Sequence, residues 1–329
     1  MKQRRQLLKV LAAGAAVLLA GPWTAARAQD YPAKPIKLVV PFGAGSTPDV
    51  FARIVGEQAG KTLGQAIVVE NRAGAGGNLG TNVVAKAAPD GYTIGVSITG
   101  PLVNNTLIYD NLPYDPFKDL APIGGIGITP TLIVAATSVP ANDIKGLVDW
   151  SKTKPDGLNY STAGYGLQQH LASEEIAQRT GAKFTHVAYR GGGTAMTDLI
   201  AARLDFGGFL AGTTKPLIAS GQLRGLAIVA EKRSDLVPDI PTTTEQGLPG
   251  MNAHGVHFMM FAPAATPRPV VALLEAELKK IIADPALAKR FADIGFDATP
   301  MSGEEVAGAL RQTGEKLVPV IKRLNIKLD

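Results

Sequence analysis

One local pattern constrains the fold of this chain more than any other: an apolar strand, a turn of small residues, and then a helix. Its first copy leads from the apolar run at 36–40 through Phe42 and a Gly/Ala/Ser/Thr turn to Pro48, a residue suited to the first position of a helix. The first N–H groups of a helix have no partner within it, and they attract anions. Because this turn holds no Lys, Arg or His, the pattern predicts an anion site made of backbone N–H groups and hydroxyls.

Similar turns follow at residues 74–80, 161–166 and 190–194. Alternating strands and helices predict parallel strands, and ligands of open α/β sheets bind beyond the carboxyl ends of such strands. An alternative is that the Ser, Thr and Gly residues only cap helices. Four turns facing one cleft favour a ligand role. We therefore expect two α/β lobes joined by two crossing segments, with the ligand between them.

The N-terminus has the pattern of a signal peptide. A basic start is followed by an apolar run at 10–20, too short to span a bilayer, and by Ala-Arg-Ala at 26–28. We expect residues 1–28 to be removed and the mature protein to be soluble in the periplasm. Export by the Sec route and by the twin-arginine route, suggested by Arg4-Arg5, both remain open.

Charge and cysteine content exclude several classes of function. Of the 33 basic and 28 acidic residues, five basic ones and no acidic one fall within residues 1–28, so the mature chain is near neutral. A near-neutral chain has no basic surface field for nucleic acid. With no Cys, the chain has no disulfide, no thiol nucleophile and no cysteine that could carry a lipid anchor.

We expect no cofactor, no metal and no catalytic centre. Neither a complete G-x-G-x-x-G nor a G-x-x-x-x-G-K-[ST] motif is present, and the four His residues match no metal-ligand spacing. Ser161, His170 and Asp205 could be drawn as a triad, but no G-x-S-x-G motif supports it. Arg72 and Arg190 lie nearest to the turns, where each could bind a carboxylate or pair with a local acid.

A set of motifs, in order along the chain, resembles the periplasmic solute-binding proteins of tripartite tricarboxylate transporters, the Bordetella uptake (Bug) family. They are Val40-Pro41-Phe42 with Asp49 and Ala52-Arg53, the run at 69–77, Pro89-Asp90-Gly91-Tyr92-Thr93, Leu112-Pro113-Tyr114-Asp115-Pro116, His170-Leu171, Tyr189-Arg190-Gly191, Thr197-Asp198-Leu199, and Ala262-Pro263 with Thr266-Pro267. The resemblance implies a two-lobed periplasmic binding protein fold, with a mostly parallel sheet flanked by helices in each lobe. It places lobe 1 at residues 29–127 and 255–329, and lobe 2 at 128–254.

The resemblance also implies a function and a set of ligand-binding residues. We expect a monomer that captures a small carboxylate, either a di- or tricarboxylate or an aromatic acid, and delivers it to the membrane subunits of the transporter. The alternative partner is a membrane sensor on which the liganded protein docks. The expected ligand-binding residues are Phe42, Ala44, Ser46, Thr47, Ser97, Thr99, Ser161, Thr162, Gly164, Tyr189, Arg190, Asp205 and His257.

Three departures from the family pattern fall at expected ligand positions. The first turn has Gly45-Ser46 where Gly-Gly is usual, and the late crossing strand has His257 and Met259 where Trp and Gly are frequent. Leu167 stands where a Ser often follows the last Gly of the second-lobe turn. No single substrate of the family is therefore implied for this chain.

Overall fold

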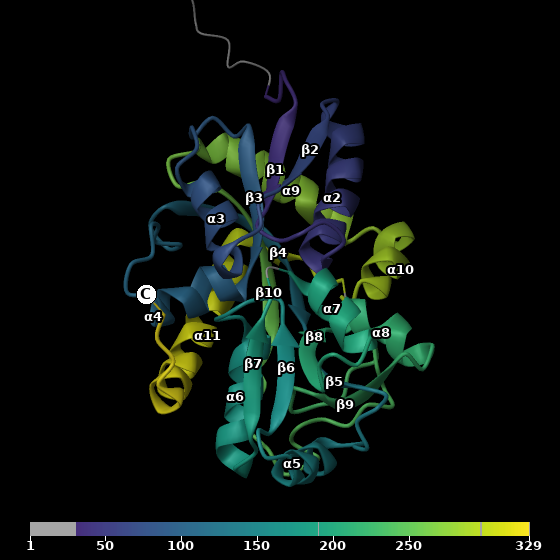
Figure 1. The fold of residues 1–329 in the computed structure, drawn as a ribbon. Coiled ribbons are helices and arrows are strands. Elements are labelled where there is room, and N and C mark those ends of the chain that lie inside the picture. The colour runs from purple at the N-terminus through teal and green to yellow at the C-terminus, as the bar shows by residue number, and fades with distance from the viewer. Residues whose placement is uncertain (1–30, 190, 297, 329) are drawn as a thin grey trace, which may run out of the picture. The chain divides into compact units, whose positions relative to one another are not determined.

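The computed structural model describes residues 31–189, 191–296 and 298–328. The predicted signal peptide and Arg190 lie outside the described residues. Residues 34–329 form one compact unit that holds both sheets, and the two are drawn in Figure 1. The helices and strands alternate, as the sequence predicts, but the sheets are mixed rather than mostly parallel.

The first sheet has six strands in the order β11-β4-β10-β3-β1-β2. Three of them pair in parallel, while β10, β4 and β11 are antiparallel to their neighbours. The strands are β1 (Ile36–Val40), β2 (Ile67–Asn71), β3 (Thr93–Ile98), β4 (Leu120–Thr129), β10 (Val256–Pro263) and β11 (Met301–Ser302).

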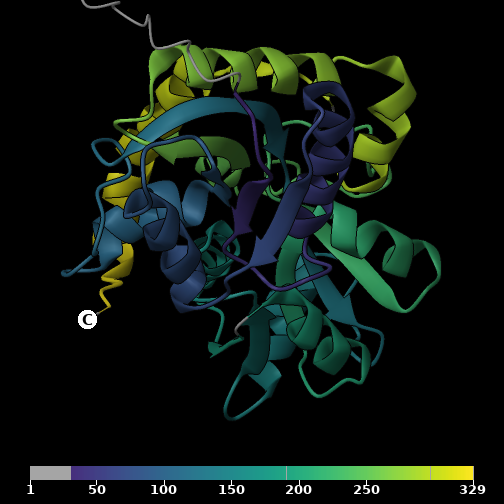
Figure 2. The ribbon, with the colours of Figure 1, turned by 90° about the horizontal axis from the view of Figure 1, so that it is seen from above.

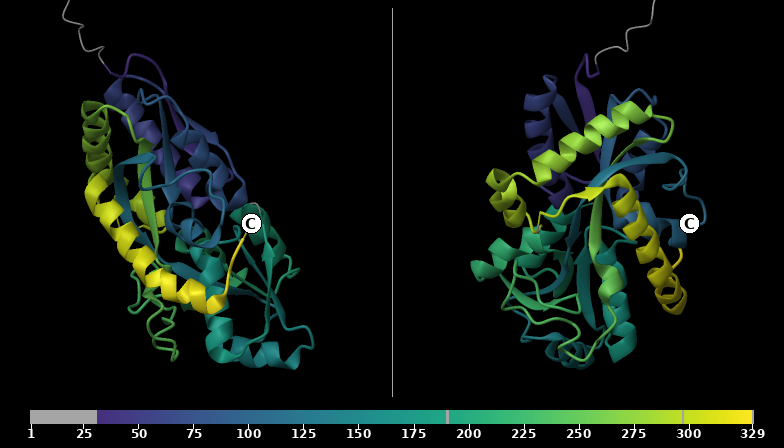
Figure 3. Two further views of the ribbon diagram at one scale, coloured as in Figure 1. Left: turned by 90° about the vertical axis from the view of Figure 1, so that its left-hand side faces the viewer. Right: turned by 180° about the vertical axis from the view of Figure 1, so that it is seen from behind.

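Helices cover both faces of the first sheet. Figure 2 shows α3 on one face and α9 on the other, and Figure 3 shows α9 and the long α11 crossing behind the strands. The helical elements around this sheet are α2 (Thr47–Leu63), η1 (Ala75–Gly77), α3 (Asn78–Ala85), η2 (Gly100–Asn104), α4 (Asn105–Ile108), α9 (Arg268–Ile282), α10 (Pro285–Asp293) and α11 (Gly303–Leu324).

The second sheet has five strands in the order β7-β6-β8-β5-β9, again with parallel and antiparallel pairs. Its elements are β5 (Thr131–Ala136), α5 (Ile144–Thr153), β6 (Leu158–Thr162), α6 (Gln168–Thr180), β7 (Phe184–Ala188), α7 (Gly192–Ile200), β8 (Phe206–Leu210), α8 (Ala211–Ala219) and β9 (Leu223–Ile228). Each sheet packs on its own apolar core, and burial of these side chains is the main stabilising contribution in each lobe.

The chain crosses between the sheets twice. It leaves the first sheet at Thr129 and enters the second at Thr131, and it returns through η3 (Asn252–His254) to β10. Thr131 Oγ1 donates a hydrogen bond to the carbonyl of His254 at 3.1 Å, which ties the two crossings together. The exact limits of the two domains remain a prediction.

Buried polar groups join the lobes beside the crossings. The Asn104 side chain donates to the carbonyl of Gly166 at 2.6 Å and accepts a hydrogen bond from Gln168 Nε2 at 3.0 Å. The buried carboxylate of Glu175, on α6, accepts hydrogen bonds from His254 and Arg323 at 2.8 Å each. Because α6, η3 and α11 meet at one carboxylate, these elements have a fixed mutual position in this conformation.

Candidate functional site

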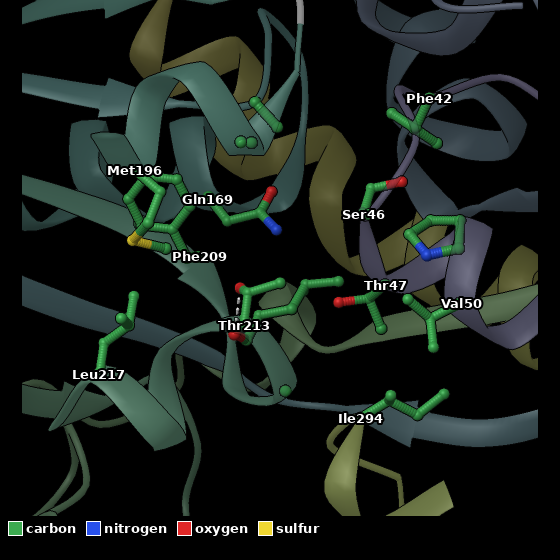
Figure 4. A pocket seen from close by; sticks show the side chains of 18 of the residues that line it. Phe42, Ser46, Thr47, Val50, Gln169, Met196, Phe209, Thr213, Leu217 and Ile294 are labelled. Carbon is green, nitrogen blue, oxygen red and sulfur yellow. Dashed lines mark hydrogen bonds between the residues drawn. The ribbon is translucent and has the colours of Figure 1, made fainter. Parts of the chain in front are cut away.

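A cavity of about 410 Å³ is lined by residues of both lobes (Figure 4). The first lobe contributes the β1–α2 turn and Ile294, and the second contributes the first turns of α6, α7 and α8. The lining residues are Phe42, Gly45, Ser46, Thr47, Pro48, Val50, Ile98, Ala163, Leu167, Gln169, Gly192, Gly193, Met196, Thr197, Ile200, Gly208, Phe209, Leu210, Gly212, Thr213, Pro216, Leu217 and Ile294.

Four helix N-termini open on this cavity, those of α2, α6, α7 and α8. In the described part of the chain, none of their N-cap residues makes a side-chain capping hydrogen bond. The N–H of Ala211, the first residue of α8, donates to the carbonyl of Pro130 at 3.3 Å, and the other first N–H groups of these helices have no capping side chain among the described residues as a partner. Each N-terminus also carries a partial positive charge, so the four together favour an anion.

The described residues that line the cavity include no Asp, Glu, Lys, Arg or His. An anion bound here would meet amide N–H groups, hydroxyls and a side-chain amide instead of a lysine or arginine. Hydrogen bonds from such neutral donors stabilise a buried anion when enough of them converge. The described lining thus holds no local cation, and the anion site stays a prediction.

Asp49 holds the β1–α2 turn in shape from behind. Its side chain is 2 % exposed and accepts hydrogen bonds from Gly45 N–H and Asn71 Nδ2, at 2.9 Å each, and from Arg53 Nε at 3.0 Å. Burial alone would raise the pKa of this carboxyl, but the hydrogen bonds from Arg53, Gly45 and Asn71 outweigh burial and lower the pKa. Arg53 is therefore occupied by Asp49 and is no ligand group in this conformation.

The polar side chains in the cavity differ in whether they already form hydrogen bonds within the protein. The hydroxyls of Ser46 and Thr213 already donate to backbone carbonyls, of Gly43 at 2.7 Å and of Leu210 at 3.0 Å. Thr47 points its hydroxyl into the cavity, and the Gln169 side chain points toward the side where Ser46 and Thr47 lie (Figure 4). Thr47 and Gln169 thus combine with the helix N-termini as the free polar groups.

Apolar side chains form another part of the wall. Met196, Phe209 and Leu217 lie together on the side of the second lobe, and Val50 and Ile294 lie on the side of the first (Figure 4). A ligand that fills the cavity therefore has both polar and apolar surroundings, which is typical of a small-molecule site.

A second cavity, of about 230 Å³, lies next to the first and shares Phe42 and Ala163 with it. It is lined by the turn at 74–77 and by Gly164, Tyr165 and Tyr189. The lobes approach closely here, since a Cβ on Gly76 would lie 2.7 Å from the carbonyl oxygen of Tyr165. Gly76 also has φ +60°, so a glycine is favoured there for two reasons.

The predicted ligand residues divide into several groups. Phe42, Ser46 and Thr47 line the first cavity, while Phe42, Gly164 and Tyr189 line the second. Ala44 lies exposed on the β1–α2 turn. Arg190 falls outside the described residues.

Four predicted hydroxyl residues are fully buried, and three of them are occupied within the protein. Ser97 Oγ lies 3.2 Å from Thr81 Oγ1, Thr99 Oγ1 accepts from His257 N–H at 2.8 Å, and Thr162 Oγ1 lies 2.8 Å from His186 Nε2. Ser161 Oγ has no hydrogen-bond partner among the described residues. In this conformation these side chains support the strand ends behind the cavity.

The predictions for Asp205 and His257 need correction. Asp205 precedes β8, and its carboxylate accepts from Asn159 N–H at 2.8 Å, whereas the cavity lies at the opposite, carboxyl end of β8. His257 is 6 % exposed within β10, and burial lowers its pKa to about 4, so it is a neutral residue of the strand.

The triad drawn from Ser161, His170 and Asp205 is contradicted by the structure. His170 Nδ1 accepts a hydrogen bond from Gly166 N–H at 3.3 Å, and the His170 ring stacks on His186 with 4.2 Å between centroids. Burial lowers the pKa of His170 to about 4, and burial together with the nearby His170 lowers the pKa of His186 to about 3. The two rings are therefore neutral packing elements near pH 7.

Sequence reasoning missed the fourth turn at the cavity, Gly208 to Thr213. The signal was present, because a Gly-Gly-Phe-Leu strand runs into Ala-Gly-Thr-Thr there, the same pattern as at the first turn. It also missed Gln169 and Ile294, whose positions depend on packing between the lobes. Within the described residues, no helix is long and apolar enough to cross a bilayer, and no cluster of His, Asp and Glu suits a metal ion.

Comparison with known proteins identifies the family. Residues 51–326 match the model of the tripartite tricarboxylate transporter family receptor, TctC. The chain belongs to this family. The predicted resemblance is thereby confirmed, and with it a solute-binding role. The family and its structural neighbours are binding proteins, which supports binding rather than catalysis.

The relatives match the receptor over nearly its full length. A UPF0065 protein of Bordetella bronchiseptica is 36% identical over 313 residues, covering 95% of this chain and 92% of that protein. The structure of the periplasmic binding protein BugD superposes with TM-score 0.85 at 33% identity, over 90% of this chain and 99% of that one. An R. palustris protein solved with adipate gives TM-score 0.86 at 29% identity, over 90% and 99% of the two chains. These neighbours confirm the two-lobed fold.

Proposed function

We propose that this TctC receptor captures a small carboxylate in the 410 Å³ cavity, in the periplasm, and delivers it to the membrane subunits of a tripartite tricarboxylate transporter. The observation that carries the proposal is the convergence of four helix N-termini on one cavity whose described lining holds no acidic side chain. Such a site stabilises a negative charge, and its described lining offers no acidic side chain to a cation.

The adipate in the structural neighbour supports a carboxylate as the ligand class. The family to which the chain belongs supports delivery to a transporter. Capture between two lobes suits a delivery protein, because opening the lobes separates the α2 N-terminus from those of α6, α7 and α8 and so releases the anion.

Titration calorimetry on the purified protein tests the ligand class. We expect some members of a carboxylate panel to bind, and the corresponding primary amides to bind at least about tenfold more weakly, because an amide has no charge for the helix N-termini to stabilise. Equal binding of acids and amides, or no binding of any acid, would contradict the proposal.

A variant tests the position of the carboxylate. Thr47→Val removes the hydroxyl that points into the cavity while keeping the side-chain shape, and should weaken acid binding about 10- to 100-fold, as expected for a hydrogen bond to a charged group. Thr180→Val is the matched control, because the Thr180 hydroxyl donates to Ile176 O at the far end of α6. Uptake of the same acid into cells that carry the transporter subunits, with and without this receptor, tests delivery.

A further inference from the structure

The amide of Gln169 offers a hydrogen-bond donor to the cavity from the second lobe. Gln169 lies in the first turn of α6 and is 3 % exposed. Its amide oxygen is buried and has no hydrogen-bond partner among the described residues, while its amide nitrogen faces the cavity (Figure 4). An N–H group of a buried side chain is satisfied best by an acceptor bound next to it. An ionised carboxylate accepts hydrogen bonds and donates none, so it suits this position.

Thr47 faces the same space from the first lobe. Its side chain is 3 % exposed, and its hydroxyl points into the cavity on the side toward which the Gln169 amide is directed (Figure 4). Thr47 and Gln169 lie at the N-termini of α2 and α6, which favour negative charge at the same place. One carboxylate can therefore accept a hydrogen bond from each lobe.

The far part of the wall suits an apolar group better than a second carboxylate. Met196, Phe209 and Leu217 lie together on the side of the second lobe (Figure 4). The hydroxyls of Thr197 and Thr213, on the same two helices as Met196 and Leu217, already donate to the carbonyls of Gly193 and Leu210, at 3.1 Å and 3.0 Å. A hydroxyl that has donated its hydrogen can only accept, so in this conformation neither threonine can hold a carboxylate oxygen.

The backbone N–H groups in this part of the wall do not make up the difference. The N–H of Ala211, at the start of α8, donates to the carbonyl of Pro130 at 3.3 Å. The N–H groups that remain at the starts of α7 and α8 contribute far less than the dehydration of a second carboxylate costs. An apolar group has no such cost and gains affinity in proportion to the area that it buries.

We infer that the ligand carries a single carboxylate on an apolar body. The carboxylate is held between Thr47 and Gln169, and the body lies against Met196, Phe209 and Leu217. The inference rests on the proposed function, since it assumes that a carboxylate binds in this cavity. It goes beyond that function by excluding di- and tricarboxylates and by naming the residue of the second lobe that binds the acid.

Two acids of matched shape test the inference by calorimetry on the purified protein. Adipate has a carboxylate at each end, and 6-methylheptanoate has an isopropyl group in place of one of them. The wild-type protein should bind 6-methylheptanoate at least about tenfold more tightly than adipate, because the second carboxylate would lose its hydration without gaining enough hydrogen bonds. Adipate that binds as tightly as 6-methylheptanoate, or more tightly, would overturn the inference.

Gln169→Met removes the amide and keeps the length of the side chain. The variant should bind 6-methylheptanoate about 10- to 100-fold more weakly than wild type, as expected for the loss of a hydrogen bond to a charged group. Gln312→Met makes the same change at an exposed position of α11 and should leave the affinity unchanged. Unchanged affinity in Gln169→Met would overturn the role assigned to Gln169.

Leu217→Lys places a cation beside the proposed apolar body. The preference for 6-methylheptanoate over adipate should fall to about one or reverse, because the ammonium can pair with the second carboxylate. Ala219→Lys adds the same charge at an exposed position of α8, outside the described lining of the cavity, and should preserve the preference. An unchanged preference in Leu217→Lys would overturn the position assigned to the body. Met196→Lys makes the same test from α7 if circular dichroism shows that Leu217→Lys does not fold.

The same data separate the two proposals. If adipate binds at least as tightly as 6-methylheptanoate, carboxylate capture stands and the inference of a single carboxylate falls. If no acid in the panel binds, or if 6-methylheptanamide binds as tightly as 6-methylheptanoate, the proposed function itself fails. Circular dichroism of every variant confirms that it is folded before binding is compared.

Discussion

Gly212→Ala is the substitution for which the structure makes its sharpest prediction. Gly212 lies in the first turn of α8, in the second lobe, and faces the end of α10 in the first. A Cβ at this position would lie 2.0 Å from the carbonyl oxygen of Ile294 and 2.2 Å from its carbonyl carbon. Both are backbone atoms, so no side-chain rotation relieves the clash. The distance from this Cβ to the carbonyl oxygen of Ile294 would have to grow by about 1.4 Å to reach 3.4 Å, where ordinary van der Waals contact begins.

The simplest relief is for the lobes to separate at this edge of the cavity, because Gly212 and Ile294 both line it. Introducing a methyl group into a packed contact costs about 1–3 kcal/mol. If that cost is paid on closure, the dissociation constant of any carboxylate that wild type binds should rise roughly 5- to 150-fold. If the lobes separate at this edge, the clash is removed without unfolding, so the unfolding temperature without ligand should change little.

Calorimetry measures the affinity, and thermal unfolding followed by circular dichroism measures the stability. Gly308→Ala is the control, because Gly308 lies within α11 and a Cβ there would meet nothing within 4 Å. Unchanged affinity of Gly212→Ala, or a large loss of stability with unchanged affinity, would refute the reasoning that this contact seals the cavity.

Three further predictions concern stability. Glu175→Ala should lower the free energy of unfolding, measured in urea titrations, by about 3 kcal/mol, because it leaves buried His254 without its partner and breaks the link to Arg323. A loss below about 1 kcal/mol would contradict this prediction. Asp143→Ala should cost about 1 kcal/mol, because the Asp143 side chain caps α5 by accepting from Gly146 N–H at 2.6 Å; an unchanged urea midpoint would argue against the cap. Acid should destabilise the protein, because burial lowers the folded-state pKa values of His170, His186 and His257 to about 4, 3 and 4, below the usual 6.5. Below about pH 6.5 the unfolded state therefore binds more protons than the folded state. The free energy of unfolding should be at its full value above about pH 6.5 and should fall as the pH is lowered toward 4. Urea titrations between about pH 6.5 and pH 4 test this prediction. A free energy of unfolding that does not change with pH would contradict it.

The sequence was sufficient to predict most elements because local signals marked them. The helix α2 begins at Thr47, so Pro48 is its second residue rather than its first as the sequence predicts. Pro48 and Asp49 in its first turn, and Gly64 in the left-handed conformation after its end, all act within a few residues. The start of α11 has a local signal of the same kind, a capping box formed by Ser302 and Glu305. These signals do not depend on the other lobe, so the sequence carries them in full.

The site was less predictable, because its residues are selected by tertiary packing. Ser161 lies in β6 and Asp205 directly precedes the neighbouring β8, and only the register of these two strands shows that Asp205 lies at the far end from the cavity. The hydroxyls of Ser97, Thr99 and Thr162 look free in the sequence but are occupied by partners from distant segments. Gln169 differs from these three residues, because its amide oxygen is buried and has no hydrogen-bond partner among the described residues.

The use of helix N-termini instead of charged side chains explains how a site without a described charged side chain can still be selective. A lysine or arginine would hold a carboxylate with either lobe alone, whereas helix N-termini attract an anion only over about one turn. The α2 N-terminus belongs to the first lobe and those of α6, α7 and α8 to the second, so the full field acts on the ligand only while the lobes are closed. Closure in turn depends on close contacts such as Gly212 with Ile294 and Gly76 with Tyr165. A ligand too large for the cavity loses these contacts and the α2 N-terminus together, so that affinity depends on shape as steeply as on charge.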